Sequence, residues 1–171
     1  MSPKLLIAVF AVALSACYAS NALLLNPSEP AHPIEEGTYV REGSDALRVN
    51  LDPDGWYRVE QVQAGGLIGE SHRVLLNTVP LGGGREGFAA AQETDDGWDY
   101  AIGYVDHGRV YLATPDCVDP LDRSDAVDHG GFADDDDPMT HNCQFRSRGA
   151  LISALAAFAG HAEFGAPYQR K

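Results

Sequence analysis

The feature that most limits what this chain can fold into is a succession of short segments with period-two alternation, beginning at Gly37. In the clearest segment, Leu47, Val49 and Leu51 share one face, and the residues between them are polar. Alternation with this period indicates β-strands that bury one face. The sequence DPDG at 52–55 follows as a turn signal, because proline presets an early turn position and glycine accepts a positive φ. The chain is therefore expected to form hairpins joined by tight turns.

The same pattern recurs between later turn residues. Trp98, Tyr100 and Tyr104 share a face after a DDG turn, and a DHG turn at 106–108 opens the next segment. Further segments of this kind lie near residues 39, 57–59, 73–79 and 144. So many short antiparallel strands must close or stack to hide their apolar faces. We predict a mainly β (α+β) domain, an antiparallel meander of seven or eight strands that forms a small barrel or a curved sheet.

One helix is expected, at the C-terminal end of the chain. Ser147 can cap its start, and Leu151, Leu155 and Phe158 recur at spacings of four and three, which places them on one helical face. The pattern predicts a helix over about 147–160 whose apolar stripe covers the sheet as part of the core.

The charge balance excludes one large class of function. The chain has 171 residues, enough for one domain, and carries 12 Lys and Arg against 25 Asp and Glu, a formal charge of −13. A protein that binds nucleic acid by neutralising phosphates needs the opposite balance. We therefore expect no nucleic-acid partner, and no electrostatic attraction to an anionic membrane surface.

The N-terminus has the layout of an export signal. Lys4 precedes an unbroken apolar run from Leu5 to Leu14, which is short for a membrane span and suits the apolar part of a signal peptide. The residues that follow, Leu14-Ser15-Ala16-Cys17, resemble the lipobox of bacterial lipoproteins. The alternative is an ordinary secretory signal, cut after Ala19.

The lipobox resemblance implies an anchor and a compartment. It implies a signal peptide at 1–16, cleavage before Cys17, and a diacylglyceryl group on the Cys17 sulfur with an acyl chain on the new amino terminus. Tyr18 in the next position favours the outer over the inner membrane, with the protein facing the periplasm. The stretch 17–36 contains Pro27, Pro30 and Pro33 and is expected to be a tether, followed by a single domain over 37–171.

The implied envelope location also bears on the other two cysteines. Thiols in an oxidising compartment pair, so we expect a disulfide between Cys117 and Cys143, 26 residues apart. Such a bridge stabilises by about 3–4 kcal/mol in a chain-entropy estimate. A metal site is the competing interpretation, but no C-x-x-C spacing supports it.

The segment enclosed by these cysteines is strongly acidic. Between Asp116 and Asp137 there are nine Asp and a single Arg, and the last four form an unbroken run, Asp134, Asp135, Asp136 and Asp137. Ca²⁺ binds six to eight oxygen ligands, so this run is a candidate metal site, although the order of ligands in an EF-hand is missing. The alternative is a solvated acidic loop that like charges keep open.

The sequence contains no convincing arrangement of catalytic residues. Ser71 lies next to His72, but no nucleophile-elbow motif surrounds the serine. Trp98, Tyr100 and Tyr104, with Tyr57, either line a ligand pocket inside a barrel or simply fill the core. We expect a protein that is not an enzyme.

These observations predict a lipid-anchored bacterial cell-envelope protein that serves as a structural or protein-binding module. Its partners would be the membrane, through the N-terminal lipid, and a cationic or envelope protein docked on the acidic loop. The alternative is a periplasmic lipoprotein that binds a divalent cation such as Ca²⁺, or a small apolar ligand inside the barrel. No other cofactor is expected.

Overall fold

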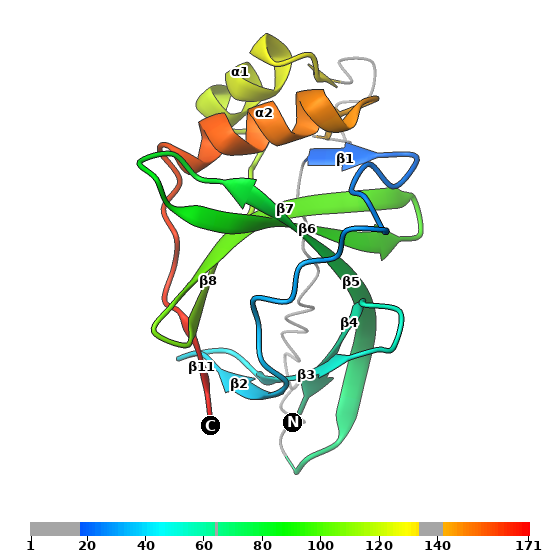
Figure 1. Cartoon of the computed structure of the whole chain (residues 1–171), viewed down its shortest axis with the longest axis vertical. Coiled ribbons are helices and arrows are strands. Elements are labelled where there is room, and N and C mark those ends of the chain that lie inside the picture. Colours follow the sequence, from blue (N-terminus) through cyan, green and yellow to red (C-terminus); the bar gives the residue numbers. More distant parts are fainter. Residues whose placement is uncertain (1–17, 64, 134–141) are drawn as a thin grey trace, which may run out of the picture.

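The computed structural model describes residues 18–63, 65–133 and 142–171. Within them, eight antiparallel strands close into a barrel (Figure 1). Strands β2 to β8 pair in sequence order, and β11 closes the ring by pairing with both β8 and β2. The barrel strands are β2 (Gly37–Val40), β3 (Ala46–Leu51), β4 (Tyr57–Val62), β5 (Ile68–Pro80), β6 (Glu86–Thr94), β7 (Gly97–Asp106), β8 (Arg109–Ala113) and β11 (Tyr168–Arg170). The predicted β meander is confirmed, and it is a closed barrel.

A second layer covers one side of the barrel. Strand β1 (Tyr18–Ser20) pairs with β7 and with β10 (Cys143–Gln144), which pairs in turn with β9 (Phe132–Ala133). Helices α1 (Pro120–Asp128) and α2 (Arg148–Ala159) lie together over β1, β6 and β7 (Figure 1). In the described part of the chain, neither helix has the length and apolar composition needed to span a bilayer.

The barrel wall separates two hydrophobic cores. Alternate residues of β7 show the division: Ala101 faces the barrel interior, whereas Tyr100 and Ile102 face outward, because side chains alternate along a strand. The outward residues of β5, β6 and β7 pack against β1 and α2, including the fully buried Leu151 and Leu155. The predicted C-terminal helix is therefore present and covers the sheet.

The sequence predicts the start of one helix but not of the other. Ser147 caps α2 by accepting a hydrogen bond from the Ala150 N–H, as expected. Helix α1 was not predicted, and its start is encoded by Asp119, whose side chain accepts from the Leu121 and Asp122 N–H groups, followed by Pro120 in the first turn. Because this stretch contains so many aspartates, the capping role of Asp119 was not recognised in the sequence.

The predicted tether at 17–36 is wrong for the residues that the structure describes. Tyr18 and Leu25 are buried, and the connection between β1 and β2, residues 21–36, runs along the barrel (Figure 1). We call residues 21–36 the strap. The Ala31 N–H donates to the Leu76 carbonyl oxygen at 2.7 Å, beyond the point where β4 stops pairing with β5. The prolines keep the strap out of the central strands, but burial of leucine and an open strand edge hold it against the domain.

Candidate ligand-binding site inside the barrel

The barrel interior contains a cavity of about 100 Å³. Its wall is built from inward-facing residues of the barrel strands, placed there by the same alternation that the sequence shows. Most of this wall is hydrocarbon, and the aromatic residues among it are large and buried. The apolar wall includes Tyr39, Leu47, Val49, Tyr57, Val74, Leu76, Phe88, Ala90, Val110 and Tyr168. A mainly apolar cavity of this kind suits a small apolar molecule.

One end of the cavity is polar. Gln61, Glu70, His72 and Gln92 line it there, at the end of the barrel that carries the β4–β5 hairpin. Each occupies a position at which its strand points a side chain into the barrel. The pairings of Val59 with His72 and of Val74 with Gln92 place β4, β5 and β6 side by side here. The cavity therefore combines an apolar body with a compact polar end.

Asp99 extends this polar end onto β7. It pairs with Gln92 and shares the face of Ala101, which lies in the barrel core. Burial, with a smaller contribution from the nearby charge of Asp96, raises the pKa of Asp99 from 3.8 to about 6. The desolvated surroundings that raise this pKa also strengthen polar contacts made nearby.

His72 holds the least satisfied polar atom of this end. Its Nδ1 lies 3.2 Å from the Gln92 amide nitrogen. Its Nε2 is buried and has no hydrogen-bond partner among the described residues; the Glu70 carboxylate is 3.4 Å away, within ion-pair distance but outside hydrogen-bond geometry. Buried polar atoms are nearly always hydrogen-bonded, so a ligand that supplied an acceptor here would satisfy this one.

The strap closes another part of the cavity. Ile34 lines the cavity, and its carbonyl oxygen accepts a hydrogen bond from the Tyr57 hydroxyl at 2.8 Å. Burial raises the pKa of Tyr57, so the hydroxyl keeps its proton and remains a donor. The segment predicted as a tether is thus part of the cavity wall.

Of the four aromatic residues considered for a pocket, the structure places Tyr57 alone in the cavity wall. The other three face outward from β7: the Tyr100 hydroxyl is 2.7 Å from that of Ser20, Trp98 contacts Trp56, and Tyr104 packs in the outer core. Their shared face was predicted correctly, but it is the outer face of the wall.

Ser71 and His72 do not form a catalytic pair. Neighbouring residues of a strand point to opposite faces, and Ser71 is exposed while His72 lines the cavity. The polar residues at the cavity end were missed in the sequence because each reads as an ordinary polar residue of a strand. Their signal was available, since Gln61, His72 and Gln92 keep the inward phase of strands that are otherwise apolar.

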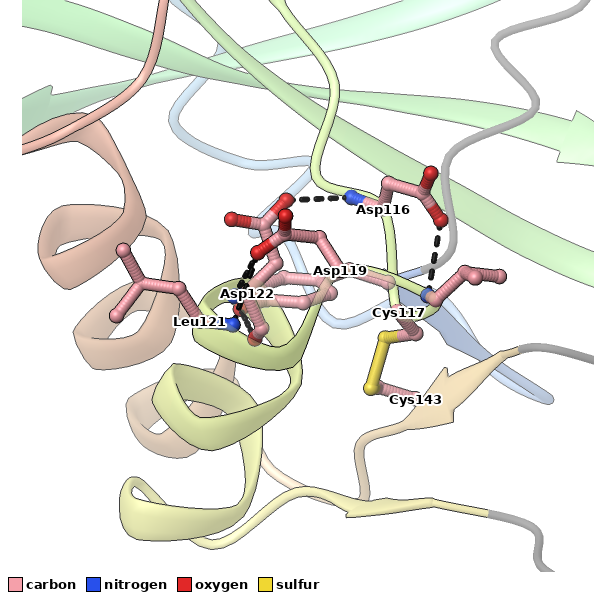
Figure 2. The surroundings of a disulfide bond; sticks show 8 residues. Asp116, Cys117, Asp119, Leu121, Asp122 and Cys143 are labelled. Atoms are coloured by element: carbon pink, nitrogen blue, oxygen red, sulfur yellow. Dashed lines mark hydrogen bonds between the residues drawn. A yellow bond between two sulfur atoms is a disulfide. The ribbon is translucent and has the colours of Figure 1, made fainter.

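The disulfide between Cys117 and Cys143 is present, with Cα atoms 5.9 Å apart. Figure 2 shows it joining the stretch before α1 to β10. Close to it, the Asp122 carboxylate accepts from the Asp116 N–H at 2.7 Å, and Asp116 accepts from the Val118 N–H at 2.9 Å. The bridge and these bonds fix the entry into α1.

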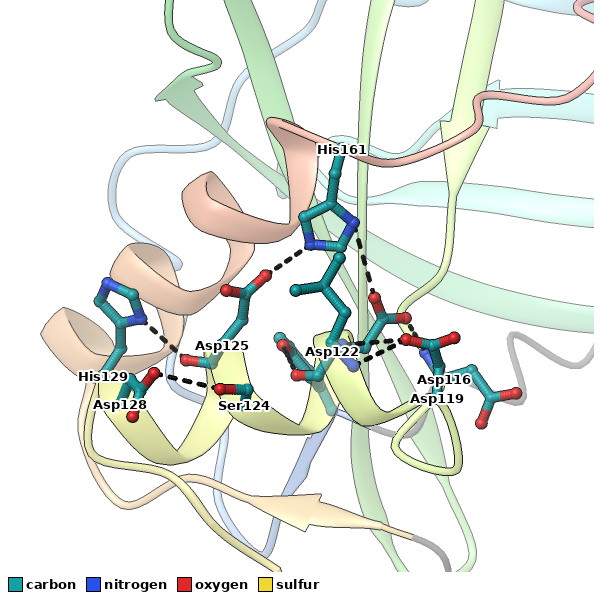
Figure 3. A network of polar contacts seen from close by, with 10 residues as sticks. Asp116, Asp119, Asp122, Ser124, Asp125, Asp128, His129 and His161 are labelled. Carbon is teal, nitrogen blue, oxygen red and sulfur yellow. Dashed lines mark hydrogen bonds and ion pairs between the residues drawn. The ribbon is translucent and has the colours of Figure 1, made fainter.

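The described aspartates of the acidic segment stabilise the fold locally (Figure 3). Asp125 lies 2.6 Å from His161 Nε2, and Asp128 accepts from the Ser124 hydroxyl at 3.2 Å. Burial raises the pKa of Asp122. The segment is thus helical where an open acidic loop was predicted, at least over 120–128.

Two predicted sites lie outside the described residues: the lipidation site Cys17, and the metal ligands Asp134, Asp135, Asp136 and Asp137. Among the residues that the structure does describe, no group of three or more His, Cys, Asp or Glu side chains is placed to hold a metal ion.

Comparison with protein-family models, with curated proteins and with solved structures finds no match for this chain.

Proposed function

We propose that this chain is a lipid-anchored protein of the bacterial cell envelope whose barrel binds a small, mainly apolar molecule without converting it. The observation that carries the binding function is the cavity of about 100 Å³, with an apolar wall and a single polar end. The anchor rests on the resemblance of Leu14-Ser15-Ala16-Cys17 to a lipobox.

The size of the cavity limits the ligand. Typical drug-sized ligands occupy pockets of roughly 300–1,000 Å³. An apolar cavity of about 150 Å³ is known to hold benzene. A space of about 100 Å³ is smaller still, so it limits the ligand to a single ring or a short branched chain.

Toluene and benzene are suitable probes of this proposal. A ligand that binds only the folded state stabilises it by mass action, so we expect both compounds to raise the melting temperature of the purified chain. Nuclear Overhauser contacts should join toluene protons to methyl groups of Leu47, Val49, Leu76 and Val110. The absence of stabilisation and of such contacts at saturating toluene would refute the binding function.

A cavity-filling variant provides the control. Ala90 lines the cavity, and Ala90→Leu adds bulk into it at a cost of about 1–3 kcal/mol from overpacking. The folded variant should lose the response to toluene. Ala150→Leu, at a half-buried position of α2 away from the cavity, adds the same bulk and should keep it. Equal responses from both variants would place the ligand elsewhere.

A second function, docking of a cationic partner, is favoured by the surface around α1. Asp116, Asp119 and Asp128 are exposed there in a chain of formal charge −13. Charge of one sign steers oppositely charged molecules, and salt screens this attraction. An oligolysine peptide should bind at low ionic strength and dissociate as salt is raised. Binding that is unchanged by salt would contradict electrostatic docking.

A further inference from the structure

The inference concerns the chemical class of the ligand, and it rests on the proposed binding function. At the polar end of the cavity, the buried His72 Nε2 and the Glu70 carboxylate lie 3.4 Å apart, and both residues line the same space. The two groups differ in what they offer to a ligand, and this difference selects its polar group.

The contact with Gln92 sets the protonation pattern of the histidine ring. An amide nitrogen donates hydrogen bonds, so the Gln92 amide, 3.2 Å from His72 Nδ1, makes that atom the acceptor. In the neutral ring the proton then sits on Nε2. The cavity therefore presents one N–H donor that has no hydrogen-bond partner among the described residues.

The neighbouring carboxylate offers only acceptor atoms. Glu70 lies at the rim, with its side chain about half exposed, and its Oε2 faces the same polar end. A ligand group that contacts both from the cavity must accept a hydrogen bond from His72 and donate one to Glu70. A hydroxyl group has both capacities.

Other polar groups fit less well. A ligand carboxylate would be repelled by Glu70, since like charges in close contact oppose each other. An ammonium group donates but cannot accept the hydrogen bond from His72 Nε2. A pure hydrocarbon leaves that buried N–H unsatisfied, which is unfavourable.

We propose that the barrel binds a small alcohol or phenol, with the ring or alkyl body in the apolar cavity and the hydroxyl within hydrogen-bond distance of both His72 and Glu70. The hydroxyl oxygen accepts a hydrogen bond from His72 Nε2–H, and the hydroxyl O–H donates a hydrogen bond to the Glu70 carboxylate. Among single-ring compounds, phenol matches this description.

The test compares three probes of similar size, phenol, toluene and benzoate, by calorimetric titration of the purified chain. We expect phenol to bind at least about tenfold more tightly than toluene, which corresponds to about 1.4 kcal/mol. Benzoate should bind more weakly than either. Phenol should also shift the His72 Nε2 resonance in the ¹⁵N spectrum, which toluene should leave unchanged.

Two variants assign the effect to the residues. His72→Phe removes the donor and keeps a ring, so phenol affinity should fall to that of toluene while toluene still binds. Glu70→Gln should weaken the preference of phenol over benzoate. Glu93→Gln is the matched control, because Glu93 is exposed at the same end of the barrel but lies on the outward phase of β6; it should change neither affinity.

The outcomes separate the two proposals. If toluene and phenol bind equally and His72→Phe changes neither, the hydroxyl-binding inference is wrong while the binding function stands. If benzoate binds most tightly, the ligand is an anion and the role given to Glu70 is wrong. If none of the three probes binds, the binding function itself fails.

Discussion

Asn77, a buried side chain of β5, makes several of the hydrogen bonds that fasten the strap to the barrel wall, and removing it should loosen the strap measurably. Asn77 is 2% exposed. Its Oδ1 accepts from the Asn26 N–H at 2.7 Å, and its Nδ2 donates to the carbonyl oxygens of Asn26 and Glu29, both at 3.0 Å. An Asn77→Ala substitution removes these three hydrogen bonds together and leaves the backbone groups of Asn26 and Glu29 that they satisfy without these partners.

The expected loss follows from the three bonds. A hydrogen bond contributes about 0.5–1.5 kcal/mol net, so three bonds predict that the free energy of unfolding falls by about 1.5–4.5 kcal/mol. Urea denaturation measures this change. Hydrogen exchange should accelerate at the Asn26 and Ala31 amides, since both are held against β5 in the folded protein.

Asn26→Ala is the matched control within the strap. The Asn26 side chain accepts a single exposed hydrogen bond, from the Ser28 N–H at 3.0 Å. Its loss should cost less than about 0.5 kcal/mol, as for most surface substitutions. Equal destabilisation by the two variants, or unchanged exchange at Ala31 in Asn77→Ala, would refute the view that Asn77 fastens the strap.

Three further predictions concern the remaining layers of the fold. Replacing Cys117 and Cys143 together by Ser should lower the free energy of unfolding by about 3–4 kcal/mol, and a reductant should then have no further effect on the urea transition. Asp99 has a pKa raised from 3.8 to about 6, so folding favours its protonated form and the wild type should lose stability as pH rises between those values; Asp99→Asn should be the more stable protein above pH 6 and lose that advantage below pH 4, as melting temperatures across the range would show. Leu155→Ala should cost about 2–5 kcal/mol because Leu155, on the sheet-facing side of α2, is fully buried, whereas the half-buried Ile152, changed to Ala, should cost less in the same assay.

The features that could be predicted from the sequence are those encoded locally. Alternation around Leu47 and Val49, the DPDG turn and the cap at Ser147 each act within one element, and the strands and α2 form where they indicate. The choice between a barrel and a curved sheet could not be made this way. It depends on β11, a strand of three residues that follows α2 and pairs with both β8 and β2.

The remaining differences arise where a local signal and a tertiary contact disagree. Pro27, Pro30 and Pro33 indicate an extended chain, which the strap is, but its attachment depends on Asn77, 51 residues beyond Asn26. The polar end of the cavity has the same origin. His72 reads as a polar residue on a strand, and only the register of β4, β5 and β6 brings it beside Gln61 and Gln92.

The route by which the chain enters the domain has a mechanical consequence. Strand β1 lies between β7 and β10, and β10 is covalently tied to the segment before α1 through Cys143. Tension applied upstream of Tyr18 would pull on a strand that is hydrogen-bonded along both edges. One of its neighbours, β10, is also held by the disulfide. Reduction of the Cys117–Cys143 disulfide should lower the force at which β1 detaches, while the eight strands of the barrel stay paired.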